Sequence, residues 1–290
     1  MRRLFFVLCA LLVAGSAAAL WAGHVLTRPA RSPAIAPPAE LPVRVLSFRS
    51  DSGVRLRAWF VAGQPGAGAV LLLHGVRADK RSMTARARVL NEAGFAVLLL
   101  DLQAHGESEG DRITFGYREA RDVTAAIERL ALLAPGERIG VLGVSLGAAA
   151  AVLSDARSRY SALALESLYP TIEEAAASRL RMRLGTVGAW LAPLLLWQIE
   201  HRLGISRTAL RPIDHVGALT APVLMVHGSV DLHTPLTEAQ RIYARIRAPK
   251  SAFIVEGAAH VDLHRYAGRE FERRLVDFFS THLRGAPGAR

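Results

Sequence analysis

The sequence contains a single cysteine and few aromatic residues, and both scarcities limit what the protein can be. Because Cys9 has no partner, the chain forms no intramolecular disulfide and no cysteine-based metal site. Aromatic residues make up 7% and charged residues 21% of the chain, whereas hydrophobic residues make up 51%. This composition excludes an intrinsically disordered protein and is typical of a globular one.

Lysine is also scarce, so arginine carries nearly all of the net charge of +11. The arginines are spread along the chain among acidic residues, and no motif that binds nucleic acid is present. We therefore expect no nucleic-acid partner. Two interpretations of the charge remain open: attraction to anionic phospholipid, and a compositional bias towards arginine and alanine.

Charged side chains are absent from residues 4–26, which follow two arginines directly. A helix that rises about 1.5 Å per residue over this stretch would cross a hydrocarbon core of about 30 Å. Residues 1–26 are therefore predicted to be a transmembrane anchor, with the two arginines in the cytoplasm and the rest of the chain outside it. The alternative is a signal peptide that is cleaved near residues 17–19 and releases a periplasmic or secreted protein.

Residues 27–42 contain five prolines and are predicted to form an extended linker. Beyond the linker, two alternating or charged runs predict antiparallel or edge strands, and six continuous apolar runs predict parallel strands buried on both faces. The predicted strands are residues 43–48, 54–61, 69–74, 96–101, 138–144, 161–166, 222–227 and 251–256. Helical patterns separate most of them, so we predict an α/β fold with a mostly parallel, twisted sheet of about eight strands and helices on both faces.

This sheet and its helices are predicted to form one domain over residues 43–284, followed by a flexible tail at 285–290. Within the domain, residues 168–220 hold two helical patterns where one crossover helix would suffice. One interpretation is a small helical cap inserted over the site. The other is an ordinary long crossover helix that packs on the core.

The pentapeptide GVSLG at residues 143–147 matches the pattern G-x-S-x-G and follows a predicted strand directly. A nucleophile on a tight turn between a strand and a helix has strained backbone angles, and neighbouring glycines allow the two elements to approach closely. Ser145 is therefore predicted to be a catalytic nucleophile, although the pentapeptide alone also fits a turn without function.

A serine hydroxyl needs a general base, and the base needs an acid that orients it. Asp231 follows the seventh predicted strand and His260 follows the eighth. Because parallel strands end at the same edge of a sheet, Ser145, His260 and Asp231 are predicted to act as nucleophile, base and acid. Glu166, at the end of the sixth strand, is the alternative acid.

The segment LHGV at residues 73–76 follows the first buried strand, where a backbone N–H can turn towards the nucleophile. We predict that the main-chain N–H groups of Val76 and Leu146 form an oxyanion hole, in which each donor stabilises the transition state by about 3 kcal/mol. The side chain of His74 is predicted to stabilise the turn rather than to take part in catalysis.

Several other polar residues near these strand ends are predicted to be structural. Asp101, His105 and Ser108 form a cluster that we interpret as a turn, and His233 and His264 are interpreted as loop residues. The histidines show no metal-binding spacing such as H-E-x-x-H, so neither a metal nor a dissociable cofactor is expected.

The sequence resembles α/β-hydrolases of the serine aminopeptidase and monoacylglycerol-lipase-like group, and membrane-anchored bacterial members in particular. The resemblance spans residues 43–284 and implies the same triad and the same oxyanion donors. Ala104 stands where relatives often have glycine, Ala148 after the pentapeptide is a second departure, and neither change removes a reactive group. The matching motifs are LLLHG (71–75), DLQAHGES (101–108), GVSLG (143–147), HGSVDLHTP (227–235) and EGAAHVD (256–262).

The resemblance and the motifs together predict a serine hydrolase at the bacterial inner membrane. It would cleave an ester or related acyl bond in a small, hydrophobic acyl substrate through an acyl-enzyme. A peptidase of the aminopeptidase type remains an alternative, as does a protein that binds ligands without catalysis. A dehalogenase is disfavoured because such enzymes have aspartate, not serine, in the pentapeptide.

Overall fold

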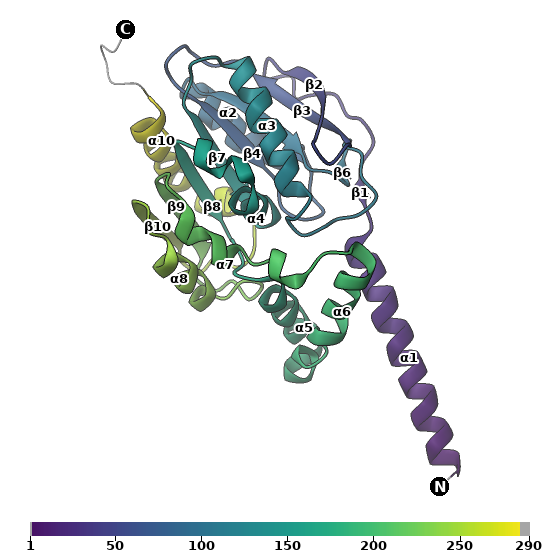
Figure 1. The fold of residues 1–290 in the computed structure, drawn as a ribbon. Coiled ribbons are helices and arrows are strands. Elements are labelled where there is room, and N and C mark those ends of the chain that lie inside the picture. The colour runs from purple at the N-terminus through teal and green to yellow at the C-terminus, as the bar shows by residue number, and fades with distance from the viewer. Residues whose placement is uncertain (1, 285–290) are drawn as a thin grey trace.

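The computed structural model describes residues 2–284, and its centre is an eight-stranded sheet with the order β10-β9-β8-β7-β4-β5-β3-β2 (Figure 1). Strands β2 and β3 are antiparallel to each other, and β3 is antiparallel to β5, whereas all other neighbours are parallel. The strands are β2 (Arg44–Arg49), β3 (Arg55–Val61), β4 (Ala69–Leu73), β5 (Ala96–Asp101), β7 (Ile139–Val144), β8 (Ala162–Glu166), β9 (Val223–Gly228) and β10 (Lys250–Val255). The predicted fold class and strand number are thereby confirmed.

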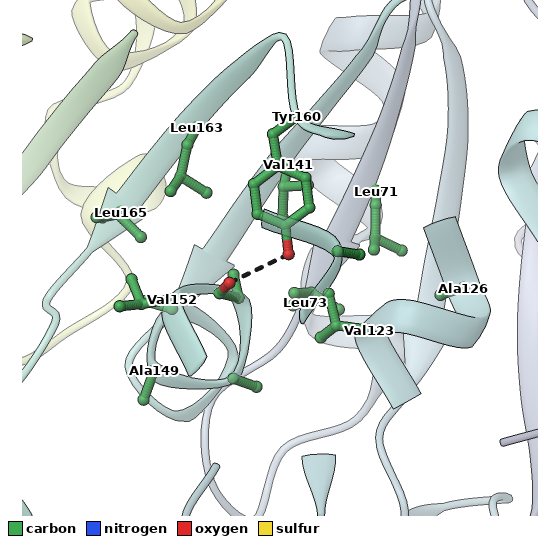
Figure 2. Close-up of a cluster of buried hydrophobic side chains, with 14 of the residues drawn as sticks. Leu71, Leu73, Val123, Ala126, Val141, Ala149, Val152, Tyr160, Leu163 and Leu165 are labelled. Atoms are coloured by element: carbon green, nitrogen blue, oxygen red, sulfur yellow. Dashed lines mark hydrogen bonds between the residues drawn. The ribbon is translucent and has the colours of Figure 1, made fainter. Parts of the chain in front are cut away.

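Helices cover both faces of this sheet because successive side chains of a strand point to opposite sides. Leu71 and Leu73 of β4 lie in one hydrophobic cluster with α3 (Glu119–Leu133), α4 (Leu146–Leu153) and α8 (Leu236–Arg245). Figure 2 shows this cluster, in which the Tyr160 hydroxyl donates to the carbonyl of Ala151 at 3.1 Å.

The alternate residues of β4, Val70 and Leu72, lie in a second cluster on the opposite face. This face is covered by α2 (Thr84–Glu92) and α10 (Arg269–Leu283). A side chain at Gly140 of β7 would place its Cβ 2.6 Å from Cε1 of Phe279, so glycine at this position allows α10 to pack closely on the sheet. The two clusters hold the strand ends in fixed positions relative to one another.

The segment between β8 and β9 contains two helices in place of one crossover helix. They are α5 (Ile172–Ala189) and α6 (Ala192–Leu203), and they pack on each other through a third hydrophobic cluster that is separate from the sheet. The interval also contains the short helix α7 (Pro212–His215) and 3₁₀ turns at Arg207–Ala209 and Val216–Ala218. These elements lie in the region where a cap was expected. The helices α5 and α6 and the turn between them are named the cap for this reason, and their position over the site stays a prediction.

The N-terminal residues form α1 (Arg2–Thr27), which projects from the body of the protein beside α6 (Figure 1). Near its C-terminal end, Gln198 donates to the carbonyl of Ala19 at 2.8 Å and Arg202 donates to that of Leu20 at 2.9 Å. Within residues 2–284, no helix combines the length and the apolar character that crossing a membrane requires. The predicted transmembrane anchor at residues 1–26 therefore finds no support here.

The predicted linker at residues 27–42 is only partly an extended tether. Residues Ala30–Arg31 form the strand β1, which pairs in parallel with β6 (His105–Gly106). The N–H of Ala30 donates to the carbonyl of Ala104 at 2.7 Å, and the N–H of Ile113 donates to that of Thr27 at 2.8 Å. The start of the linker is thus bound to the loop after β5, whereas the predicted tail at 285–290 lies outside the described residues.

Candidate active site

Ser145 stands at the junction of β7 and α4 with a strained backbone, at φ 49° and ψ −104°. A positive φ is uncommon for a residue with a side chain and marks a position that its surroundings enforce. A Cβ at Gly143 would lie 2.5 Å from the Ala148 nitrogen, and one at Gly147 would lie 2.6 Å from the Leu73 oxygen. Glycine is therefore required on both sides of Ser145, and the strand and the helix approach as closely as the motif predicts.

The loop after β4 lies directly against this turn because β4 and β7 are neighbours in the sheet. A Cβ built on Gly75 would lie 3.9 Å from the Cβ of Ser145. Within the described residues, neither the N–H of Val76 nor that of Leu146 donates a hydrogen bond. Both N–H groups are thus free of other partners in the described part of the chain, and Leu146 is the first residue of α4, where backbone N–H groups lack helical partners.

His74 uses both ring nitrogens to stabilise this loop. Its Nδ1 lies 2.8 Å from the carbonyl of Gly75, and its Nε2 accepts from the N–H of Leu102 at 3.2 Å. Complete burial, with the nearby His105, lowers the pKa of His74 to about 3. The side chain is therefore neutral with its proton on Nδ1, in agreement with the predicted structural role.

Asp231 and His260 lie side by side in the loops after β9 and β10, which are neighbouring strands. The Nδ1 of His260 lies 2.7 Å from Oδ2 of Asp231. The same carboxylate accepts three further hydrogen bonds, from the N–H of His233 at 2.8 Å and from the N–H and hydroxyl of Thr234 at 3.0 and 2.9 Å. The acid is therefore held rigidly and can orient the imidazole.

These contacts also keep Asp231 ionised. Burial alone would raise its pKa, but the hydrogen bond and charge of His260, together with the bonds from Thr234, lower the pKa to about 2. A second histidine supports the same loop, since Nε2 of His227 lies 2.7 Å from the carbonyl of Thr234. A carboxylate charged at neutral pH is what an orienting acid beside an imidazole requires.

His233 stacks on His260, a contact that the sequence did not predict. The two rings are nearly parallel, at 6°, and their centroids lie 4.8 Å apart. Burial, followed by the charges of His260 and Arg179, lowers the pKa of His233. The position of His233, two residues after the predicted acid, is the only signal in the sequence that pointed to this contact.

The nucleophile and the base are not joined directly in this structure. Among the hydrogen bonds of residues 2–284, none links Oγ of Ser145 to His260. Ser145 is 3% exposed, so the segments around it largely cover the site. The structure brings the predicted acid to the predicted base and the loop after β4 to the serine, and both the oxyanion hole and the complete triad stay predictions.

The alternative acid, Glu166, faces a different partner. Both of its carboxylate oxygens accept from the Arg86 guanidinium, at 2.8 and 2.9 Å, and the side chains of both residues are buried. Asp231 rather than Glu166 therefore holds the contact with His260. The ion pair with Arg86 explains why a buried carboxylate stands at the end of β8.

The remaining polar residues take structural contacts. Asp101 accepts from Nζ of Lys80 at 2.6 Å, and the Ser108 hydroxyl donates to the carbonyl of Asp101 at 2.6 Å, so this cluster forms a turn. His264 pairs with Glu272 at 2.8 Å. Within the described part of the chain, no three histidine, cysteine or acidic residues lie close enough together to hold a metal ion.

Comparison with known proteins identifies the family of this chain. Residues 64–202 match the family described as serine aminopeptidase, S33. The uncharacterised protein Rv2307c of Mycobacterium tuberculosis is 30% identical over 230 residues, which cover 78% of this chain and 75% of the relative. The chain belongs to the serine aminopeptidase (S33) family of α/β-hydrolases.

Two solved structures show the same α/β-hydrolase fold. The Pyrococcus furiosus esterase Pf2001 superposes with a TM-score of 0.74 at 20% identity, over 90% of this chain and 99% of the esterase. A monoacylglycerol lipase from Paleococcus ferrophilus superposes with a TM-score of 0.58 at 23% identity, over 78% of this chain and 99% of the lipase. The predicted resemblance to S33-type α/β-hydrolases is confirmed, whereas the resemblance to membrane-anchored members finds no support. These two structures support the fold alone.

Proposed function

We propose that this α/β-hydrolase is a serine hydrolase that cleaves an ester or related acyl bond. The observation that carries the proposal is the 2.7 Å contact between His260 and an ionised Asp231, at the sheet edge that also presents the strained Ser145. An acid that already orients an imidazole has prepared it to accept a proton through its other nitrogen. A protein that only bound ligands would have no need for this pair.

The mechanism follows from the roles of these groups. Nε2 of His260 takes the hydroxyl proton as Oγ of Ser145 attacks the carbonyl carbon, while Asp231 holds the proton on Nδ1. The N–H groups of Val76 and Leu146 then stabilise the negative charge on the tetrahedral oxygen. His260 returns the proton to the leaving alcohol, and water that is activated in the same way releases the acid from the acyl-enzyme.

Labelling with a fluorophosphonate tests this proposal. Wild-type protein should be labelled covalently, and Ser145→Ala should lose both the label and ester hydrolysis, by at least about 10³-fold. Ser229→Ala is the matched control, because Ser229 lies in the loop of Asp231 but donates to Glu256 at 3.0 Å. Equal labelling of wild type and Ser145→Ala would disprove the assignment of the nucleophile.

Hydrophobic acyl chains are the proposed substrate class. Apolar side chains of α5, α6 and the turn between them are exposed, with Trp190 at 85%, and the esterase Pf2001 and the monoacylglycerol lipase share the fold. Hydrolysis of p-nitrophenyl esters should therefore become more efficient as the acyl chain lengthens. A rate that falls steadily beyond acetate would contradict this specificity.

A peptidase of the aminopeptidase type is the second candidate, and one observation favours it. Among the described residues, Glu174 of α5 and Glu238 of α8 each have a buried oxygen without a hydrogen-bond partner, while the other oxygen of Glu174 accepts from Arg241 at 3.0 Å. Burial and the neighbouring Glu174 raise the pKa of Glu238 to about 7. Such a pair suits a substrate ammonium group. Aminoacyl p-nitroanilides should therefore be tested in the same assay. Faster cleavage of these amides than of esters would favour the peptidase.

We further propose that the enzyme works at a lipid surface, at the outer face of the bacterial inner membrane. The support is a set of exposed apolar side chains at the tip of the cap: Leu184, Val187, Trp190, Leu191 and Leu194. Trp21 of α1 is also exposed. Trp190→Ser should weaken cosedimentation with phospholipid vesicles. Leu132→Ser, which changes a 75% exposed leucine on α3, should leave it unchanged.

A further inference from the structure

Helix α2 contributes one buried cation that contacts two segments of the candidate site. Arg86 is 2% exposed, and its Nη2 lies 2.8 and 2.9 Å from the two carboxylate oxygens of Glu166 and 2.8 Å from Oδ1 of Asp262. The guanidinium carbon also lies 5.2 Å from the centre of the Phe271 ring. A single side chain thus bridges the end of β8 and the loop after β10.

One acidic partner is hydrogen-bonded to a residue of the proposed triad, and the other lies two residues from one. The backbone carbonyl of Glu166 accepts from the N–H of Ser145 at 2.8 Å. Asp262 stands two residues after His260 and accepts from the N–H of His264 at 3.1 Å, which caps the helix α9 (Leu263–Ala267). Arg86 therefore connects the backbone that holds the nucleophile to the backbone that holds the base.

Electrostatic attraction holds the Arg86 guanidinium between the carboxylates of Glu166 and Asp262. Burial alone would lower the pKa of Arg86, but the charges of Glu166 and Asp262 raise it, so the guanidinium stays protonated. Burial alone would raise the pKa of Asp262, and the charge of Arg86 lowers it instead. Hydrogen bonds between charged groups are short and strong, and a buried carboxylate that loses its partner is costly. The two loops are thus held against the same cation.

We propose that Arg86 is a positioning residue that sets the distance and orientation between Ser145 and His260. This proposal rests on the proposed function, since it assigns a role within the same triad. A displacement of about 1 Å between reacting groups can cost about 100-fold in rate. The residue touches neither the substrate nor the reacting atoms, and it acts by fixing the two loops.

The test must separate positioning from stability, because Arg86→Met leaves Glu166 buried and unpaired. The double variant Arg86→Met/Glu166→Gln removes the cation and the buried charge together, so it should recover most of the lost stability. Lys80→Met is the matched control: Lys80 is equally buried and pairs with Asp101 and Glu107, at 2.6 and 2.7 Å, in a different loop. Melting temperature, kcat and KM are measured for one p-nitrophenyl ester.

We expect the double variant to keep a KM within about twofold of wild type while kcat falls about 100-fold. Lys80→Met should melt at a lower temperature but keep its kcat, and Arg86→Lys should recover part of the lost rate. A double variant with wild-type kcat, or a kcat that tracks melting temperature across all variants, would overturn the positioning role. Wild-type protein without ester turnover or fluorophosphonate labelling would overturn the proposed function itself.

Discussion

At the residue scale, hydrogen bonding and burial act on two buried aspartates in opposite ways. Four donors surround the carboxylate of Asp231, and its pKa falls to about 2. Asp122, by contrast, is fully buried in α3, and burial raises its pKa to about 8 although the N–H of Gln103 donates to it at 2.8 Å. The acid of the candidate site is thus charged at neutral pH, whereas Asp122 is largely protonated.

The raised pKa of Asp122 predicts a pH-dependent stability. Folding raises this pKa from 3.8 to about 8, so the contribution of Asp122 to stability is complete below pH 3.8 and is lost as the pH rises towards 8. Asp122→Asn removes this dependence. In urea unfolding, the free energy of unfolding of wild type should therefore fall relative to the variant between about pH 5 and pH 8, by up to about 1.4 kcal/mol per pH unit.

A variant of an exposed aspartate provides the control for this measurement. The side chain of Asp155 is 100% exposed, so Asp155→Asn makes the same chemical change at the surface and is measured over the same pH range. If the difference between Asp122→Asn and wild type were constant with pH, the carboxyl group would not titrate in this range.

At the element scale, the sequence predicted what depends on local pattern and missed what depends on contacts between distant segments. All eight main strands lie within one or two residues of their predicted positions, because continuous apolar runs and turn residues define them locally. Strand β1 was predicted as linker, since a pairing of two residues with β6 leaves no periodic signal. The candidate site shows the same division between what local sequence patterns predict and what contacts between distant segments determine.

Within the site, the motif residues and the order of strand ends predicted Ser145, Asp231 and His260. The stack of His233 on His260 and the pair of Arg86 with Glu166 depend on the orientation of side chains. Arg86 and Glu166 are also 80 positions apart in the sequence. Only the packed structure shows such contacts.

The junction of α1 with the cap gives a prediction at this scale. A Cβ at Gly23 would lie 2.4 Å from Oε1 of Gln198, so Gly23→Val must displace this amide and break its bond to the carbonyl of Ala19. Without this hydrogen bond the junction should be about 1 kcal/mol less stable, so it should open more often. Tryptic cleavage after Arg28 should therefore become about fivefold faster. Gly15→Val is the control in the same helix, since no atom of the described side chains lies within 4 Å of its added Cβ. Equal cleavage of the two variants would show that α1 does not depend on this contact.

At the scale of the whole molecule, the net charge of +11 has two interpretations, which differ in where the charge acts. If a compositional bias explains the arginines, no part of the surface should bind anionic lipid preferentially. If the cap meets a membrane, its cations should matter more than others. Arg181 and Arg183 are exposed beside the apolar tip of the cap, whereas Arg88 and Arg121 are exposed on α2 and α3.

Vesicle binding at two salt concentrations distinguishes these cases. An exposed arginine near an anionic membrane contributes about 1 kcal/mol, and salt screens this attraction. Binding to vesicles that contain phosphatidylglycerol should therefore weaken at least about tenfold between about 0.05 and 0.5 M NaCl, while weak binding to pure phosphatidylcholine changes little. Arg181→Gln/Arg183→Gln should remove most of the salt-sensitive part, and Arg88→Gln/Arg121→Gln should not. Because both double variants change the net charge equally, an equal loss of binding would assign the effect to diffuse charge and would exclude the cap as the membrane-facing surface.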